Sequence, residues 1–176
     1  MARAQCLVIR GNRVLMVRHR VDGVSWWCLP GGAVEVGEAP DRAALRELAE
    51  ECVVTGRILR QTSHVDYGAG DEAVTFLVDI ADQSPSLGHD PECQDSAPVL
   101  VDQAWLMIEE IPERDRAFLW AGGLLGIRAF WEEVESWSDT ISYPAAVRLD
   151  PALGASLRSP SPNGIGEGQP PVRAAG

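Results

Sequence analysis

The chain has 176 residues, of which 45% are hydrophobic, and it carries a formal net charge of −11. This length and apolar content predict one domain with a sizeable core. The acidic balance, with a pI near 4.6, argues against a nucleic-acid partner, because proteins that bind phosphate backbones usually carry a basic patch or a high pI. A polyanionic substrate would therefore need a metal ion or a local basic cluster.

The sequence shows no targeting signal. The N-terminal segment MARAQCLVIRG lacks the long apolar core and the small-residue cleavage site of a signal peptide. No uncharged run reaches the roughly 20 residues of a membrane span. The four cysteines are widely spaced and three lie in apolar runs, so we expect buried thiols rather than disulfides or a zinc site. We therefore expect a soluble, cytoplasmic protein with no membrane partner.

Extended segments come first along the chain. Gly11-Asn12 accepts positive φ and separates two apolar runs, which predicts a β-hairpin. Pro30 and the two glycines after it are expected to end the third strand. The run VTFLVDI is unbroken in its apolar character, which favours a buried strand. In all, strands are predicted over residues 4–10, 13–19, 26–29, 57–65, 72–82 and 98–108.

Two helical regions are predicted among these strands. Pro40 suits the first turn of a helix whose Leu45, Leu48 and Cys52 share one face, opposite a group of glutamates. The second region starts at Pro112, breaks near two glycines and resumes with an apolar stripe typical of core packing: Leu124, Ile127, Trp131 and Val134. Together these elements predict an α/β sandwich with a mixed sheet and helices on both faces.

Two segments stand outside this pattern. Residues 83–97 are rich in Ser, Pro and Asp and predict a surface loop of a length that is often functional. From Pro151 onward, half of the 26 residues are Pro, Gly or Ser. We expect a domain over residues 1–142 and a disordered tail over 143–176.

The predicted helix at 40–52 gathers like charges. Glu47, Glu50 and Glu51 fall within roughly a 100° arc of its surface. Two such charges about 6 Å apart repel by about 3 kcal/mol at the effective dielectric near a protein surface. One interpretation is a solvated acidic face, softened by Arg46 one turn before Glu50. The other is a divalent cation, because Mg²⁺ is held by oxygen ligands and completes its shell with waters and substrate phosphates.

The spacing of these residues resembles the Nudix box, G-x5-E-x7-R-E-U-x-E-E-x-G-U with U aliphatic. The fixed positions are matched by Gly32, Glu38, Arg46, Glu47, Glu50 and Glu51. The one departure is Val53 in place of the final glycine, where a left-handed turn would end the helix and a β-branched residue would be strained. The resemblance covers roughly residues 4–137. It implies a Nudix-like α/β/α sandwich with a mixed sheet, a box helix and a C-terminal helix.

The resemblance also implies a chemistry. Nudix enzymes cleave a nucleoside diphosphate linked to another moiety by water attack at phosphorus, with Mg²⁺ or Mn²⁺ as cofactor. The implied catalytic residues are Glu47, Glu50 and Arg46. The implied metal ligands are the Gly32 carbonyl, Glu47, Glu50, Glu51 and Glu92, the last in the 83–97 loop, with an ordinary solvated loop charge as its alternative.

The roles within this set are not all equally specified. Glu47 is a candidate general base, whereas other members of the family take that base from a downstream loop. Arg46 is expected to orient Glu47 and to pair with Glu38 rather than to touch the substrate, as its counterpart in the family does.

Signals outside the box are weaker. Trp26 and Tyr67 could stack on a base, although core or rim packing is favoured for each. Arg18, His19 and Arg20 form the nearest basic patch in the sequence and could contact phosphates.

Several functions stay open. A non-catalytic Nudix-fold nucleotide-binding or regulatory module is the alternative to a hydrolase, but such modules usually lose box glutamates that this chain keeps. The sequence has no Cys and Glu pair at a spacing that would favour isomerisation of an isoprenoid diphosphate. The absence of proline between Val54 and Pro85 argues weakly against ADP-ribose. A nucleotide-type small molecule is the expected partner, and a homodimer is left open because many members of the family are dimers.

Overall fold

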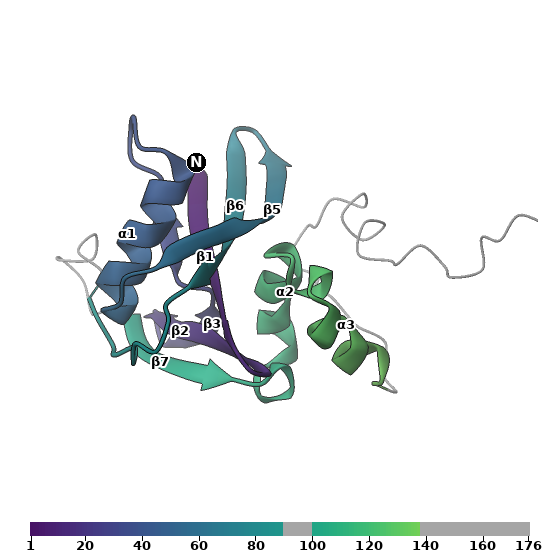
Figure 1. Ribbon diagram of the computed structural model, residues 1–176. Coiled ribbons are helices and arrows are strands. Elements are labelled where there is room, and N and C mark those ends of the chain that lie inside the picture. The colour runs from purple at the N-terminus through teal and green to yellow at the C-terminus, as the bar shows by residue number, and fades with distance from the viewer. Residues whose placement is uncertain (90–99, 138–176) are drawn as a thin grey trace, which may run out of the picture.

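The computed structural model describes residues 1–89 and 100–137 and contains a mixed sheet with helices packed on it (Figure 1). In this part of the chain the strands are β1 (Ala2–Arg10), β2 (Arg13–Val21), β3 (Val24–Cys28), β4 (Gly31–Ala33), β5 (Arg57–Gly68), β6 (Asp71–Asp79) and β7 (Leu100–Leu106). The helices are α1 (Pro40–Cys52), α2 (Glu113–Ala121) and α3 (Arg128–Glu135), with short 3₁₀ turns η2 (Ile108–Glu110) and η3 (Leu124–Gly126).

Strand β1 is the centre of the sheet. The order of the main path is β3-β2-β1-β6-β5, with β4 paired to β1 and β7 paired to β2. The β1–β6 pair is parallel and the other pairs are antiparallel. Residues 3–5 of β1 pair with β4, whereas residues 9 and 10 pair with β2, so β1 joins the two halves of the sheet.

Helices cover both faces of the sheet. Figure 1 shows α1 on one side of the strands and α2 with α3 on the other. Ala44, Leu48 and Cys52 of α1 belong to one apolar core, and Trp120 and Phe130 of the C-terminal helices belong to the other. The predicted α/β fold with a mixed sheet is therefore confirmed.

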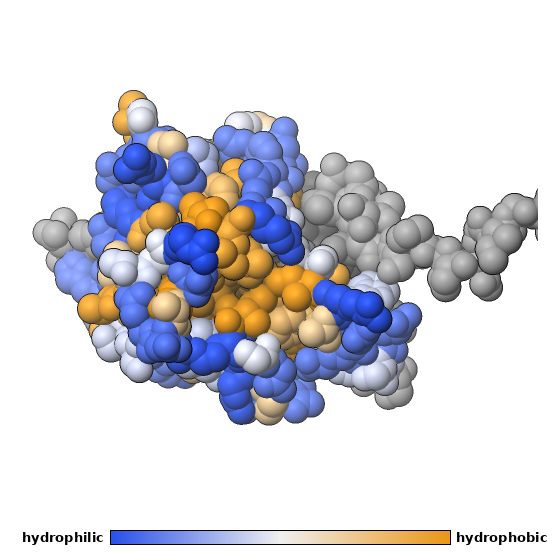
Figure 2. Space-filling view, in the orientation of Figure 1, coloured by the Kyte–Doolittle hydropathy of each residue, from blue (hydrophilic) through white to orange (hydrophobic). Residues whose placement is uncertain are grey.

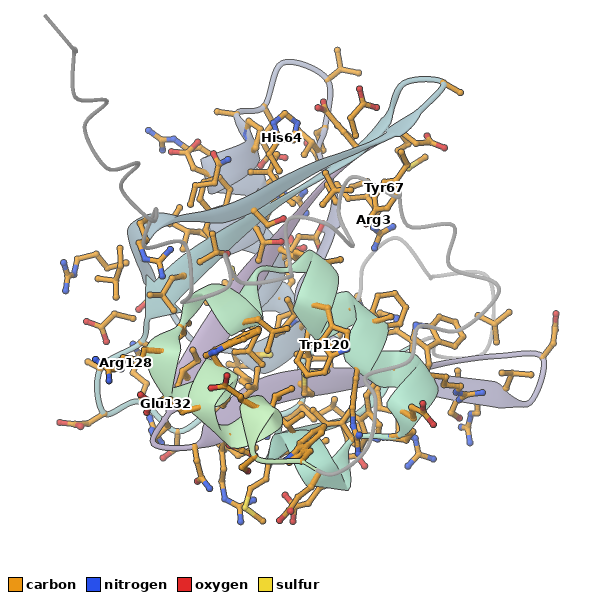
Figure 3. All side chains as sticks on the ribbon, turned by 90° about the vertical axis from the view of Figure 1, so that its right-hand side faces the viewer. Arg3, His64, Tyr67, Trp120, Arg128 and Glu132 are labelled. Carbon is orange, nitrogen blue, oxygen red and sulfur yellow. The ribbon has the colours of Figure 1, made fainter. Side chains whose placement is uncertain are left out.

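The C-terminal helical stripe also packs as predicted. Leu124, Phe130 and Val134 are buried against the sheet, and Ile127 and Trp131 pack on the same core. Trp120 of α2 is buried, whereas Figure 3 shows Arg128 and Glu132 on the outer surface of α3. On the face seen in Figure 2, apolar side chains gather between α1 and α2, ringed by hydrophilic ones.

Residues 31–33 form a strand that the sequence did not predict. The two glycines were expected to end β3, yet Gly31 and Gly32 pair with Gln5 and Ala4 of β1. A Cβ atom on Gly31, which has a φ of 151°, would lie 2.3 Å from the Ala4 carbonyl oxygen. Backbone pairing therefore forms β4, and the lack of a side chain at Gly31 permits the close approach.

Some expectations fall on residues outside the described ranges. Glu92 and Cys93 belong to the segment 90–99, and the boundary at residue 142 with the tail 143–176 lies beyond residue 137. The other three cysteines are free thiols; Cys6 and Cys52 are buried, as expected, whereas Cys28 is only partly buried. Within the described ranges no helix combines the length and apolarity that a membrane crossing needs.

Candidate active site

Helix α1 begins and ends as its sequence predicts. Pro40 occupies the first turn, and Val53 caps the end with a φ of 54° and a ψ of 40°, which is left-handed backbone. The Val53 N–H donates to the Ala49 carbonyl at 3.1 Å. The expected strain at position 53 is therefore present, because a β-branched residue stands where glycine is favoured.

Two of the three glutamates that were expected opposite the apolar face of α1 are buried, so the expectation of an exposed acidic side is wrong for Glu47 and Glu51. Glu47 and Glu51 are only 5% and 2% exposed, and they are buried together with Ala44 and Leu48. Only Glu50 of the three keeps partial contact with solvent. A solvated acidic face is therefore excluded for Glu47 and Glu51, which point along the flank of α1 toward the sheet.

The glycines of β4 let these carboxylates approach the backbone. The Gly31 N–H donates to Oε2 of Glu51 at 2.8 Å. A Cβ atom on Gly32 would lie 2.3 Å from Oε1 of Glu47. Any side chain at position 32 would therefore displace the Glu47 carboxylate.

Arg46 connects the acidic residues to one another. Its Nε and Nη2 donate to the two oxygens of Glu38 at 3.2 and 3.1 Å, and Nη2 also donates to the Ala33 carbonyl. Its Nη1 donates to Oε1 of Glu47 at 3.0 Å and to Oε2 of Glu50 at 3.1 Å. The predicted pairing of Arg46 with Glu38 and its contact with Glu47 are both confirmed.

The electrostatics of the cluster follow from these contacts. Hydrogen bonds from Arg46 lower the pKa of Glu38 below its usual value. Burial raises the pKa of Glu47 to about 7, since Glu51 and Glu50 add to the effect and Arg46 only partly opposes it. The carboxylates of Glu38, Glu47 and Glu50 thus share the guanidinium of Arg46, which does not reach Glu51. The cluster therefore has more negative than positive charge.

His19 lies beside the third glutamate. Its Nε2 atom is 3.2 Å from Oε1 of Glu51, and the residue is only 9% exposed. The contact lacks hydrogen-bond geometry, and Nε2 has no other partner. The ring of Trp26 stacks on the imidazole with centroids 6.0 Å apart and planes 18° apart. Packing, the favoured role for Trp26, is therefore observed.

The basic patch expected around His19 does not form. Arg18 points to the opposite face of β2, where its guanidinium lies 5.9 Å from the Trp27 ring and 4.0 Å from Asp102. Arg20 is exposed. Neighbouring residues of a strand alternate between faces, so three consecutive basic residues cannot point into one site.

His19 was expected in a basic patch, and neither its place beside Glu51 nor the role of Asp115 in the fold was predicted. The alternation of Leu15, Val17 and His19 along β2 could have placed His19 on the face that α1 covers. Asp115 of α2 is 2% exposed and accepts the Trp27 N–H at 2.9 Å, which ties β3 to α2. No local pattern marks Asp115, because its partner lies 88 residues away.

Backbone hydrogen bonds join the first part of the 83–97 loop to the end of α1. The N–H groups of Ser86, Gly88 and His89 donate to the carbonyls of the last helical residues, Cys52, Glu51 and Glu50, at 2.8 to 3.0 Å. A Cβ atom on Gly88 would lie 1.8 Å from the Glu50 carbonyl oxygen. The chain therefore reaches residue 89 next to Glu50.

A separate pocket of about 510 Å³ lies on the other flank of α1, toward β5 and β6. None of the box glutamates lines it, so it is not part of the acidic cluster. Its walls are Pro40, Asp41, Ile58, Gln61, His64, Glu72, Val74 and Phe76. Tyr67, near the end of β5, is 47% exposed.

The donors of the cluster suit a hard cation. They are carboxylate oxygens and the carbonyl oxygen of a glycine, and Mg²⁺ prefers oxygen ligands. Within the described ranges no three His, Cys, Asp or Glu side chains converge on one point, because Arg46 lies between Glu47 and Glu50. The shortage of positive charge nevertheless fits a divalent ion, and Glu50 is the glutamate of the three that keeps partial contact with solvent.

Comparison with known proteins identifies a family for this chain. A sequence model of the NUDIX domain matches residues 1–121. The protein named MutT4 from Mycobacterium tuberculosis is 30% identical over 113 residues, which are 60% of this chain and 43% of that protein. The NAD-capped RNA hydrolase NudC from Pectobacterium atrosepticum is 25% identical over 114 residues, which are 62% and 41% of the two chains. The chain thus spans less than half the length of these two relatives.

Solved structures share the fold. A NUDIX hydrolase from Nitrosomonas europaea has a TM-score of 0.57 at 20% identity and covers 81% of this chain and 76% of its own. A C. elegans Ap4A hydrolase has a TM-score of 0.54 at 21% identity, with 77% and 99% covered. At these identities the likeness concerns the fold alone. Because the domain match spans well over half of the sequence, the chain belongs to the Nudix family.

Proposed function

We propose that this chain hydrolyses a diphosphate bond in a nucleoside diphosphate linked to another moiety, by attack of water at phosphorus. The observation that carries the proposal is the pair of buried carboxylates, Glu47 and Glu51, that α1 holds against the Gly31-Gly32 backbone. Buried charges are costly unless they are paired or bind a metal ion. One shared arginine leaves this cluster undercompensated, which favours a catalytic role over a structural one.

Glu47 is the proposed general base. A base works best when its pKa lies near the operating pH, and burial raises the pKa of Glu47 to about 7. Its Oε1 accepts from Arg46 at 3.0 Å, which fixes the carboxylate while the water is positioned.

Arg46 and Glu50 are the other proposed catalytic residues. Arg46 acts as an orienting group, because Glu38 and the Ala33 carbonyl hold its guanidinium on one side while Glu47 and Glu50 accept from the other. The Glu50 side chain is 30% exposed, so its carboxylate is accessible to a cation that arrives with the phosphates of a substrate.

Mg²⁺ or Mn²⁺ is the proposed cofactor. The carboxylates of Glu47, Glu50 and Glu51 and the carbonyl of Gly32 would hold the ion, and Glu92 stays a predicted further ligand. When bound, such an ion neutralises charge on the diphosphate and makes water a stronger nucleophile. The net charge of −11 makes this neutralisation necessary, because the protein repels polyanions at long range.

The relatives support a nucleotide-type substrate. NudC is named for NAD-capped RNA and MutT4 is named as a mutator protein. These names belong to those proteins, of which this chain spans less than half. The acidic balance of this chain favours a small nucleotide over a long nucleic acid.

The competing proposal is a module that binds a nucleotide without cleaving it. Product release decides between the two, measured on nucleoside triphosphates, dinucleoside polyphosphates and nucleotide sugars with Mg²⁺ or Mn²⁺. We expect turnover that EDTA abolishes and that Glu51→Gln lowers by at least about tenfold. Asp41→Asn, which neutralises an exposed acid on the same helix, is the matched control and should leave turnover unchanged. Ligand-induced thermal shifts without product would instead establish the binding module.

A further inference from the structure

The imidazole of His19 has no function in the site as proposed so far. Its Nε2 atom is fully buried, lies 3.2 Å from Oε1 of Glu51 and has no hydrogen-bond partner. Buried side-chain nitrogens in folded proteins normally have a partner, so an unpaired one calls for an explanation. In the neutral ring an unprotonated Nε2 carries a lone pair, and neutral imidazole is the commonest metal ligand in proteins.

The fold holds this nitrogen where a ligand would need it. Leu15 and Val17 of β2 face the core under α1, and His19 continues the same row at its end. A β-bulge against β7 falls between Arg18 and His19, and bulges often redirect side chains at functional sites. Trp26, the cross-strand partner of His19, stacks on the ring and limits its rotation.

The neighbouring carboxylate is equally restrained. Oε2 of Glu51 accepts the Gly31 N–H at 2.8 Å, so Oε1 is the oxygen left to face His19. Two donor atoms on one ion with bonds of about 2.1 Å at right angles lie about 3 Å apart. The observed separation of 3.2 Å between Nε2 and Oε1 is close to that spacing.

We propose that Nε2 of His19 and Oε1 of Glu51 bind one divalent cation together, so that the site offers a nitrogen donor beside its oxygens. This inference rests on the proposed function, because it requires an ion at the α1 carboxylates. Imidazole nitrogen binds the divalent transition metals, Mn²⁺ most weakly among them, whereas Mg²⁺ prefers oxygen more strictly. The mixed donor set therefore shifts the preference of the site from Mg²⁺ toward Mn²⁺.

Pulsed electron paramagnetic resonance of the full chain with one equivalent of Mn²⁺ tests the nitrogen donor directly. We expect a ¹⁴N coupling in the wild type that changes when the histidines carry ¹⁵N, which separates imidazole from backbone nitrogen. His64→Gln is the control, because His64 is exposed and pairs with Glu72 away from the cluster. It should keep the coupling, whereas His19→Gln should lose it.

Metal affinities give a second readout that needs no turnover. His19→Gln keeps an amide that can donate to Glu51, but it removes the imidazole. We expect it to weaken Mn²⁺ binding by at least about tenfold while Mg²⁺ binding changes by less than about threefold. If His19→Gln fails to fold, ¹⁵N-histidine labelling of a His64→Gln/His89→Gln variant, in which His19 is the one histidine left, still decides the question.

The failures are distinguishable. If Mn²⁺ binds and Glu51→Gln abolishes binding, yet no histidine nitrogen couples, the His19 donor is overturned and the proposed hydrolase stands. The same conclusion follows if His19→Gln lowers the stability in EDTA but leaves the Mn²⁺ spectrum intact, because His19 would then be an ion-pair partner of Glu51. If no divalent ion binds, both proposals fail.

Discussion

Gly32 lies so close to the carboxylate of Glu47 that a Cβ atom at position 32 would be 2.3 Å from Oε1. Its neighbour Gly31 is close to backbone instead, because a Cβ atom at position 31 would be 2.3 Å from the Ala4 carbonyl oxygen. Two adjacent glycines are thus required for different reasons, one for the site and one for the sheet.

The first prediction separates these reasons. Gly32→Ala should cost roughly 1 kcal/mol or less of stability, because a side-chain terminus can move away, but it should lower turnover by about 100-fold by displacing Glu47. Gly31→Ala should cost about 3 kcal/mol, because β1 backbone must shift. Urea unfolding and single-turnover assays measure the two effects. Equal stability losses in both variants would contradict this account.

The second prediction concerns the strained end of α1. Val53 has a φ of 54° and is 59% exposed, so its side chain contributes little burial. Val53→Gly should raise the free energy of unfolding by about 1 kcal/mol and the Tm by about 3 °C. Val53→Ala keeps the strain caused by a Cβ atom, so its free energy of unfolding should rise by less than half as much. A gain with alanine equal to that with glycine would assign the effect to β-branching rather than to backbone strain.

The third prediction concerns Arg46. Lysine keeps the charge but cannot span Glu38, the Ala33 carbonyl and Glu47 at once. Arg46→Lys should therefore cost about 2 kcal/mol of stability and lower turnover at least about tenfold. Arg42→Lys changes an exposed arginine on the same helix and should stay within about 0.5 kcal/mol of wild type. Urea unfolding of both variants, followed by kinetic assays, makes the comparison, and matching losses would argue against a special role for Arg46.

The fourth prediction concerns pH. Because the pKa of Glu47 is raised from 4.5 to about 7, folding favours its protonated form. The stability it contributes is present below pH 4.5 and is lost as pH rises through 7. In EDTA, the unfolding free energy of wild type relative to Glu47→Gln should fall by roughly 2 to 3 kcal/mol between about pH 5 and pH 8. A difference that is flat with pH, measured by urea unfolding, would refute the raised pKa.

Much of the local structure could be predicted from residue order. Pro40 and the apolar spacing after it place α1 correctly, and the box spacing puts Glu47, Glu50 and Glu51 on neighbouring positions of one helix. The strain at Val53 follows from the same short segment, and the resemblance to the Nudix box implied the pairing of Arg46 with Glu38. Each of these features depends on residues within about two helical turns or an adjacent loop, where chain geometry leaves few alternatives.

The burial of the acids and their neighbours could not be predicted in this way. Periodicity gives the angles of Glu47 and Glu51 around α1, but the pairing of β4 with β1 decides that this flank faces the sheet. The contact between His19 and Glu51 joins residues 32 positions apart and depends on how β2 lies under α1. Local spacing thus determines which groups α1 carries, whereas long-range strand pairing determines which of them lose water, and loss of water is what raises the pKa of Glu47.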